Sequence, residues 1–279
     1  MYNPDALKKA YDKKAANVND INNLLGKDDN LIFNHNGILM PGDNIEQPDS
    51  EAKLLKYLHK LEINQVKYLI GKMYDLEKDG LLLDAGCGSG GSSILIHNAK
   101  KCKIEGYTLS PEQAKVGNRT AKKYGIEGFV KFEVGNILYF EEKCYNKFDY
   151  IYASENTEHL TDLRLMFSEF GKVTKSAGVL IIVAWCATKG ERGMIIKKQV
   201  DEHYLTDIHT IEEYINIGCD SDWEITEVDD MTELTAPYWE ARLKSENVTG
   251  SEKFMYEGFN ANRMQYCMFK FKKKNNLTQ

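Results

Sequence analysis

The chain has 279 residues, and its 36 Lys and Arg against 42 Asp and Glu give a formal net charge of −6. This negative balance provides no field that would attract a phosphate backbone, so it disfavours a nucleic-acid partner. Hydrophobic residues make up 42% and prolines number only 5, which is typical of globular domains and excludes disordered and fibrous chains.

The cysteines and the N-terminus bear on the compartment. The six cysteines lie at least 15 residues apart, with no CxxC pair and no Cys/His cluster of zinc spacing, so we expect reduced thiols. The N-terminus has no apolar segment typical of a secretion signal, and no stretch of 18 apolar residues could span a membrane. These features predict a cytoplasmic protein without a membrane span.

The first 79 residues have mainly helical patterns. In residues 50–76, leucines, Val66 and Ile70 recur near the helical period, which predicts a long amphipathic helix. Residues 33–44, FNHNGILMPGDN, carry the glycine and proline of a loop. We therefore interpret residues 1–79 as a helical N-terminal cap.

From residue 81 onward, apolar strand patterns alternate with helical patterns. Strands are predicted at 81–85, 103–109, 129–135, 148–154 and 178–186, with helices at 92–100, 111–125 and 163–175. Near-continuous apolar strands indicate a parallel sheet covered by helices on both faces, so we predict a doubly wound α/β fold. Residues 186–262 are long for a connection and have helical spacing at 210–218 and 235–245, which predicts a lid. Residues 263–272 predict a closing strand.

A glycine turn follows the first predicted strand. Asp84, Gly86, Gly88 and Gly90 lie in LLLDAGCGSGG, where small residues allow the backbone to approach a ligand at a helix N-terminus. A dinucleotide site would instead have GxGxxG, with an acidic residue about 20 positions further on. The DxGCGxG pattern resembles motif one of class I S-adenosylmethionine-dependent methyltransferases. The resemblance implies a Rossmann-like methyltransferase domain over residues 80–279, with its lid around 186–262.

The same resemblance assigns the cofactor contacts. It implies that Asp84 lies near the methionine amino group. Thr108 ends the second strand, where such folds contact the ribose, and the amide of Gln113 can donate to and accept from hydroxyls. Asn136, with the adjacent Ile137, follows the third strand, where the family places a polar residue near adenine. A doubly wound fold that binds another nucleotide is the alternative.

The fourth strand ends in ENTEHL, which places Glu155, Glu158 and His159 at the carboxyl end of the sheet, where open α/β folds bind ligands. A carboxylate in a partly apolar cleft can stabilise positive charge or accept a proton. We prefer Glu155 because it comes first after the strand, and expect Glu158 and His159 to orient the loop. The alternative is an acidic turn that caps the next helix.

Four segments outside the strands narrow the resemblance. IHTIEEY, TAPYWEARLKS, TGSEKF and FNHNGI resemble segments of geranyl diphosphate 2-C-methyltransferases and neighbouring prenyl diphosphate C-methyltransferases. This implies methylation of an alkene carbon, with a carbocation that aromatic faces stabilise and a base, Glu155, deprotonates. Tyr238 and Trp239 would supply the aromatic faces, and we also consider four lid aromatics that could equally be core: Phe33, Tyr204, Phe254 and Phe259.

A diphosphate substrate would need cations and a metal. The predicted lid contains Lys189, Arg192, Lys197, Lys198, Arg242 and Lys244. The resemblance implies Mg²⁺ bound with the diphosphate, and we assign Asn36, Glu62 and His209 as its candidate ligands, directly or through water.

Two other functions stay open. One is a methyltransferase of the same fold that acts on an oxygen, nitrogen or ring carbon of a natural product or lipid, as tocopherol methyltransferases and cyclopropane synthases do. The other is a binding module without catalysis. Magnesium dependence and competition by inorganic diphosphate would separate the prenyl diphosphate enzyme from the first alternative. A homo-oligomer is compatible with the sequence, although no heptad seam stands out.

Overall fold

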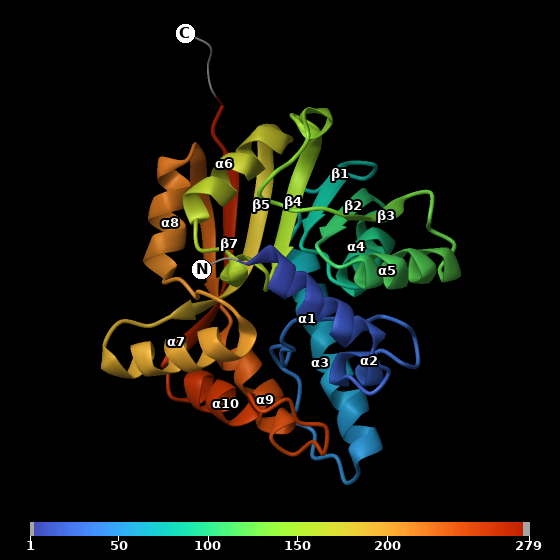
Figure 1. The fold of residues 1–279 in the computed structure, drawn as a ribbon, viewed down its shortest axis with the longest axis vertical. Coiled ribbons are helices and arrows are strands. Elements are labelled where there is room, and N and C mark those ends of the chain that lie inside the picture. Colours follow the sequence, from blue (N-terminus) through green and yellow to red (C-terminus); the bar gives the residue numbers. More distant parts are fainter. Residues whose placement is uncertain (1–2, 276–279) are drawn as a thin grey trace.

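A seven-stranded sheet forms the centre of the fold (Figure 1). The computed structural model describes residues 3–275. Its strands run in the order β3-β2-β1-β4-β5-β7-β6, with β1 to β5 parallel and β7 antiparallel to β5 and β6. The strands are β1 Leu81–Ala85, β2 Lys103–Thr108, β3 Val130–Val134, β4 Phe148–Ser154, β5 Thr174–Ala187, β6 Trp223–Asp230 and β7 Met264–Lys273. The doubly wound α/β prediction is therefore confirmed.

Helices cover both faces of the sheet, which explains why its central strands are apolar throughout. Helices α4 (Gly91–Lys100) and α5 (Pro111–Lys123) bury Ile94 and Ala114 in the core of one face. Helices α6 (Leu163–Val173) and α8 (Ile211–Asp220) bury Met166 and Tyr214 in the core of the other. Between them, β5 is buried from Gly178 to Ala187.

The N-terminal residues form three helices, α1 (Pro4–Ala16), α2 (Ile21–Leu25) and α3 (Glu51–Lys72). Asn3 caps α1 by accepting from the backbone N–H of Ala6. Pro4 is at the start of the helix, where its missing backbone N–H would have had no partner within the helix. Figure 1 shows α1 lying across one end of the sheet, with α2 and α3 beyond it. The predicted cap is thus helical, and residues 33–44 form the predicted loop.

The stretch predicted as a lid contains two kinds of element. Helices α7 (Glu191–Tyr204), α9 (Thr232–Arg242) and α10 (Glu252–Asn260) gather at the same end of the sheet as α1 (Figure 1). Between them in sequence, α8 packs on the sheet and β6 extends it, and β6 is not among the strands predicted from the sequence. The cover is therefore built from α7 and from α9 with α10, and residues 211–230 belong to the central layers.

The strand order reverses direction at β1, which pairs with β2 on one side and β4 on the other. At this switch point, the connections that leave β1 and β4 pass to opposite faces and leave a crevice at the carboxyl ends. Asp84 is opposite both Gly106 and Tyr152, so the strand that carries the glycine turn lies in the middle of this crevice.

Gly90 differs from the other two glycines predicted to contact the cofactor, because it does not line the cavity that Gly86 and Gly88 share. It caps α4 with φ +83°, and a Cβ there would lie 2.3 Å from Cζ of Phe132. Gly90 therefore allows α4 to pack against the aromatic ring of Phe132 in β3, and its contact with a cofactor stays a prediction.

We predict that Gly90→Ala destabilises the fold, because it combines left-handed backbone strain with overpacking against Phe132. Gly125→Ala is the matched control, since Gly125 has φ +69° but no atom within 4 Å of the added Cβ. Urea unfolding should show a loss about 1–3 kcal/mol larger for Gly90→Ala. Equal losses would show that packing against Phe132 makes no contribution.

Candidate active site

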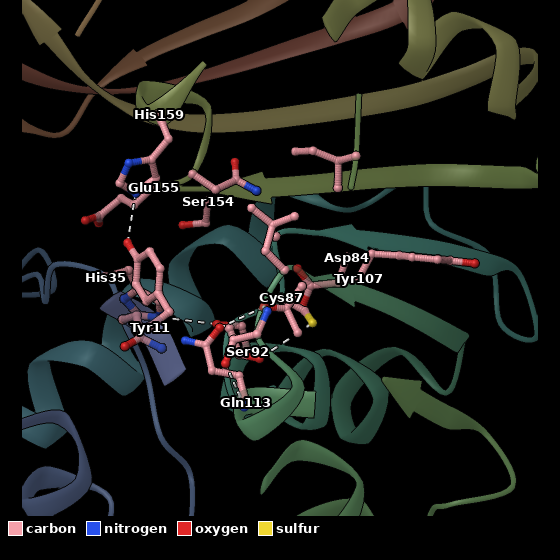
Figure 2. A pocket seen from close by; sticks show the side chains of 18 of the residues that line it. Tyr11, His35, Asp84, Cys87, Ser92, Tyr107, Gln113, Ser154, Glu155 and His159 are labelled. Atoms are coloured by element: carbon pink, nitrogen blue, oxygen red, sulfur yellow. Dashed lines mark hydrogen bonds between the residues drawn. The ribbon is translucent and has the colours of Figure 1, made fainter. Parts of the chain in front are cut away.

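The first cavity lies at the carboxyl ends of β1, β2 and β4, under α1 (Figure 2). Its volume is about 900 Å³ with the open mouth included, a size typical of small-molecule sites. Of the eight predicted cofactor contacts, seven line it: Asp84, Gly86, Gly88, Thr108, Gln113, Asn136 and Ile137. The motif residues from three strands are therefore brought together as predicted.

Asp84 is the buried carboxyl group of this cavity. It is 2% exposed, and its Oδ2 accepts a hydrogen bond of 2.5 Å from Ser93 Oγ at the start of α4. Burial raises the pKa of Asp84 to about 7, and the Ser93 bond only partly offsets this rise. A cationic group bound beside it would restore the carboxylate, so Asp84 favours a ligand with an amino group.

The remaining contacts add polar groups to the same cavity. Gly88 has φ +53°, and a Cβ there would lie 2.8 Å from Nδ2 of Asn34, so a larger residue would narrow the cavity. Thr108 Oγ1 donates to Oε1 of Gln113 at 2.7 Å, which turns the Gln113 amide toward the same space. Asn136 begins a turn by accepting from the backbone N–H of Leu138.

A second cavity adjoins the first beneath helices α7 and α9. Five residues line both cavities: Tyr11, Asn34, His35, Glu155 and His159. The second cavity also contains Trp185, Tyr204, Tyr238 and Trp239, so aromatic rings from β5, α7 and α9 surround one space. A ligand in one cavity would therefore be close to a ligand in the other, at the position of Glu155.

Glu155 directly follows β4 and has φ +49°, a backbone conformation that non-glycine residues adopt at a cost. Its Oε1 accepts from the backbone N–H of Asn36 and from the Tyr266 hydroxyl, both at 2.6 Å. Its Oε2 is buried and has no hydrogen-bond partner among the described residues. Burial, followed by repulsion from Glu158, raises the pKa of Glu155 well above its usual value.

The rest of the ENTEHL segment supports the loop. Glu158 is buried, and its Oε1 accepts from the backbone N–H of Trp185 at 2.8 Å, while burial raises its pKa to about 7. Burial lowers the pKa of His159 to about 4, so its ring is neutral at neutral pH. The ring accepts from Tyr11 through Nε2 at 2.8 Å and donates to the Leu205 carbonyl through Nδ1 at 3.1 Å (Figure 2). His159 therefore joins α1 to the loop that follows α7, which fits an orienting role.

The predicted aromatic pair lines the second cavity, with ring centroids 5.6 Å apart and an edge-to-face arrangement. The Tyr238 hydroxyl donates to Oε1 of Glu62 at 3.1 Å, and Oε2 of Glu62 lies 3.4 Å from Nδ1 of His59. Burial opposes the charged form of His59, but hydrogen bonds to Asp29 and Glu62 raise its pKa to about 9, while burial raises the pKa of the Glu62 carboxyl group beside it. Glu62 thus fixes the Tyr238 ring.

The structure does not bring the three candidate metal ligands together. Asn36 lines the second cavity, whereas Glu62 and His209 line neither cavity. His209 donates from Nε2 to the Leu160 carbonyl at 2.7 Å and packs edge-to-face on Tyr214. No group of three His, Cys, Asp or Glu side chains among residues 3–275 is arranged to hold a metal. Glu62 and His209 therefore have partners within the fold, and binding of a metal by them stays a prediction.

Most of the candidate cations and two of the aromatics lie elsewhere. Arg242 alone of the six cations lines a cavity, while four of the others pair with acidic residues: Lys189, Lys197, Lys198 and Lys244. Phe33 and Tyr204 line cavities, but Phe254 and Phe259 do not. Phe259 instead packs against Tyr266 in the core.

Sequence reasoning missed the contribution of α1. Its Tyr11 lines both cavities, and its Lys14 lines the second cavity with Nζ 5.8 Å from the Tyr204 ring centroid. Asp12 attaches α1 to the N-terminus of α5 by accepting from Ser110 Oγ at 2.6 Å. These residues have no motif, and only the helix start signal at Asn3 and Pro4 marks the segment.

We predict that Asp84 makes the ligand-free protein less stable as the pH rises. The pKa of Asp84 is about 7 in the folded protein, against 3.8 for an ordinary Asp side chain. The bound proton therefore stabilises the folded protein fully below about pH 4, and this stabilisation is lost as the pH rises to 7. Relative to Asp84→Asn, the wild type should lose up to about 4 kcal/mol of unfolding free energy over this interval.

Urea unfolding at a series of pH values measures this difference. Asp220→Asn removes an exposed carboxylate, which is paired with Arg164, and serves as the control for the loss of one negative charge. Parallel curves for Asp84→Asn and the wild type would contradict the raised pKa.

Comparison with known proteins follows the site residues. The methyltransferase domain family matches residues 76–235. Geranyl diphosphate 2-C-methyltransferase of Streptomyces lasalocidi is 33% identical over 262 residues, which covers 89% of this chain and 84% of that protein.

Two solved structures share the whole fold. A geranyl diphosphate methyltransferase in complex with GPP and sinefungin has a TM-score of 0.86 at 30% identity, covering 96% of this chain and 98% of that one. The Streptomyces coelicolor geranyl diphosphate C-methyltransferase, in complex with Mg²⁺, geranyl-S-thiolodiphosphate and S-adenosyl-L-homocysteine, has a TM-score of 0.85 at 29% identity and covers 97% of both chains. These matches confirm the family predicted from the motifs. The chain belongs to the methyltransferase domain family and, within it, to the family of the geranyl diphosphate 2-C-methyltransferases.

Proposed function

We propose that this protein transfers a methyl group from S-adenosylmethionine to an alkene carbon of a prenyl diphosphate similar to geranyl diphosphate. The observation that carries the proposal is the junction of two cavities at Glu155. One cavity has the polar lining that suits a nucleoside with an amino acid attached, and the other has aromatic rings, a carboxyl group and cations. Transfer between two ligands needs this adjacency.

The residues of the first cavity fit S-adenosylmethionine. Asp84 would hold the amino group, Thr108 and Gln113 the ribose hydroxyls, and Asn136 with Ile137 the adenine. When bound, the cofactor supplies an electrophilic methyl group. Gly88 has no side chain, so the cavity beside the Asn34 amide stays open for the cofactor. The chain around Asp84 excludes water from its carboxyl group.

The second cavity fits an alkene that becomes cationic. Methyl transfer to an alkene carbon leaves positive charge on the neighbouring carbon, and the faces of Tyr238 and Trp239 can stabilise it. Oε2 of Glu155 then accepts a proton from an adjacent carbon, and the electron pair of that C–H bond forms the new double bond. Burial favours this transfer, because a carboxylate with a raised pKa is a stronger base.

Unpaired donors in the second cavity support a diphosphate there. The unpaired groups are Nδ2 of Asn36, Nε of Arg242 and the indole Nε1 atoms of Trp185 and Trp239, which are buried and have no hydrogen-bond partner within residues 3–275. Buried donors cost stability unless an acceptor satisfies them, so four of them around one cavity favour an anion. Lys14 adds an ammonium group, and burial lowers its pKa, so a nearby anion would stabilise its charge.

Magnesium fits this site as a partner of the substrate. Of the residues considered for it, Asn36 alone lines the second cavity. Mg²⁺ is commonly held by one or two protein groups, substrate phosphates and water, so the chain needs no cage of its own. We therefore propose Asn36 as the residue nearest the metal, and the diphosphate as its main ligand.

Two further proposals concern the setting. In the described part of the chain, no helix has the length and apolar character needed to cross a bilayer. The cytoplasm remains our proposed location, and a homo-oligomer remains a prediction.

We predict that incubation with S-adenosylmethionine, Mg²⁺ and isopentenyl, geranyl or farnesyl diphosphate yields a product heavier by one CH₂. Glu155→Gln keeps the size of the side chain but removes the base, so turnover should fall by at least about 10²-fold while S-adenosylhomocysteine still binds. Mass spectrometry and calorimetry give the two measurements. Near-native turnover of Glu155→Gln would show that another group is the base.

We predict that Lys14→Met raises KM for the prenyl diphosphate, because it removes a cation from the second cavity. The increase should be about tenfold, as for the loss of one charged hydrogen bond. The adjacent Lys13→Met, at an exposed position, is the matched control and should leave KM unchanged. Inorganic diphosphate should compete with the prenyl diphosphate for this cavity. If the true methyl acceptor has no diphosphate, Lys14→Met should not raise KM and inorganic diphosphate should not compete.

A further inference from the structure

A buried tyrosine that lines neither cavity contacts Glu155. Tyr266 is in β7, where it pairs with Trp185 of β5, and its hydroxyl donates to Oε1 of Glu155 at 2.6 Å. The same hydroxyl accepts from Nε2 of Gln65 at 3.0 Å. Tyr266 and Gln65 are both 0% exposed. The hydroxyl is therefore held between a donor on α3 and an acceptor at the active site.

The backbone and ring of Tyr266 are also fixed. Its N–H donates to Thr232 Oγ1 at 3.0 Å, and its carbonyl accepts from the N–H of Met231 at 2.8 Å. The Phe259 ring of α10 packs against the Tyr266 ring with centroids 6.3 Å apart. The position of the hydroxyl is thus set by β7, by the start of α9 and by α10.

These contacts decide which oxygen of Glu155 is available. The terminal torsion of a glutamate side chain has only a broad preference, so a carboxylate without partners can rotate about it. Oε1 has two donors at 2.6 Å, from Tyr266 and from the Asn36 backbone, and such short bonds to a carboxylate are the stronger kind. Among the described residues Oε2 has no partner with good hydrogen-bond geometry, and the side chain of Trp185, which lines the second cavity together with Glu155, is the neighbouring donor that lowers the pKa of the carboxyl group.

We propose that Tyr266, held by Gln65, is a positioning residue that occupies Oε1 of Glu155 and so presents Oε2 to the substrate. Neither Tyr266 nor Gln65 lines either cavity, so neither touches the substrate and both act through Glu155. The inference rests on the proposed function. In that reaction, Oε2 accepts the proton lost by the methylated cation, and the C–H electron pair becomes the new C=C bond.

Steady-state kinetics tests the proposal. Tyr266→Phe removes only the hydroxyl, and kcat should fall about 10- to 100-fold, as for a misplaced catalytic group, with KM for the prenyl diphosphate unchanged. Gln65→Met should lower kcat in the same direction but less. Tyr68→Phe is the matched control, because it removes another hydrogen bond from a tyrosine to a carboxylate, at 2.7 Å to Asp229, on the outer side of α3.

A double-mutant cycle separates positioning from general loss of structure. In the Glu155→Gln background, Tyr266→Phe should cause no further loss of kcat, because its effect passes through Glu155. Equal losses in both backgrounds, or native kcat in the folded Tyr266→Phe variant, would overturn the proposal. If Tyr266→Phe does not fold, Gln65→Met takes its place in the same cycle and the same outcomes decide.

Unfolding experiments test the contact without any substrate. Tyr266→Phe should cost less unfolding free energy in a Glu155→Met background than in the wild type, because Met offers no acceptor to the hydroxyl. If this coupling is present but no prenyl diphosphate is methylated, the proposed function fails and the positioning contact stands. Absence of coupling would overturn the positioning role whatever the enzyme methylates.

Discussion

The burial of the Glu155 carboxyl group is the constraint on which the site depends. A carboxylate removed from water is costly unless donors surround it, and Glu155 also pays for a left-handed backbone. Two donors at 2.6 Å, from the loop before α3 and from β7, make this arrangement stable. The site is therefore assembled by segments far apart in the sequence, and the group at the junction of the two cavities is fixed only when all of them are in place.

The same principle explains why charged groups recur around the cavities. Asp84 and Glu158 are buried with raised pKa values, and the pKa of Lys14 is lowered, so each of these groups favours its neutral form more than it would in water. A ligand of opposite charge reverses that preference and gains binding energy from it. A cationic cofactor on one side and an anionic substrate on the other are the pair of charges that this arrangement favours.

Sequence reasoning succeeded where chemistry is tied to a local pattern. The glycine turn, the ends of β2 and β3 and the ENTEHL segment each follow a strand, so the parallel sheet alone brings Asp84, Thr108 and Glu155 to one crevice. It was incomplete where the decisive contact is between distant segments. Glu62 and His209 are polar residues with the composition of metal ligands, yet tertiary contacts give them the Tyr238 hydroxyl and the Leu160 carbonyl as partners. Lys14 and Tyr266 have no signal in the sequence, because only packing brings them to the site.

Helix α3 is the element that connects these observations. His59, Glu62 and Gln65 are spaced three residues apart, so they lie along one side of the helix. Through Glu62 this side fixes the ring of Tyr238, and through Gln65 it fixes the hydroxyl that holds Glu155. Tyr238 of α9 and Glu155 after β4 are far apart in the sequence, and α3 contacts both of them, through Glu62 and through Gln65 with Tyr266. Helix α3 has no sequence motif of its own. It nevertheless sets the distance between Tyr238, which would stabilise a cation, and Glu155, which would deprotonate it.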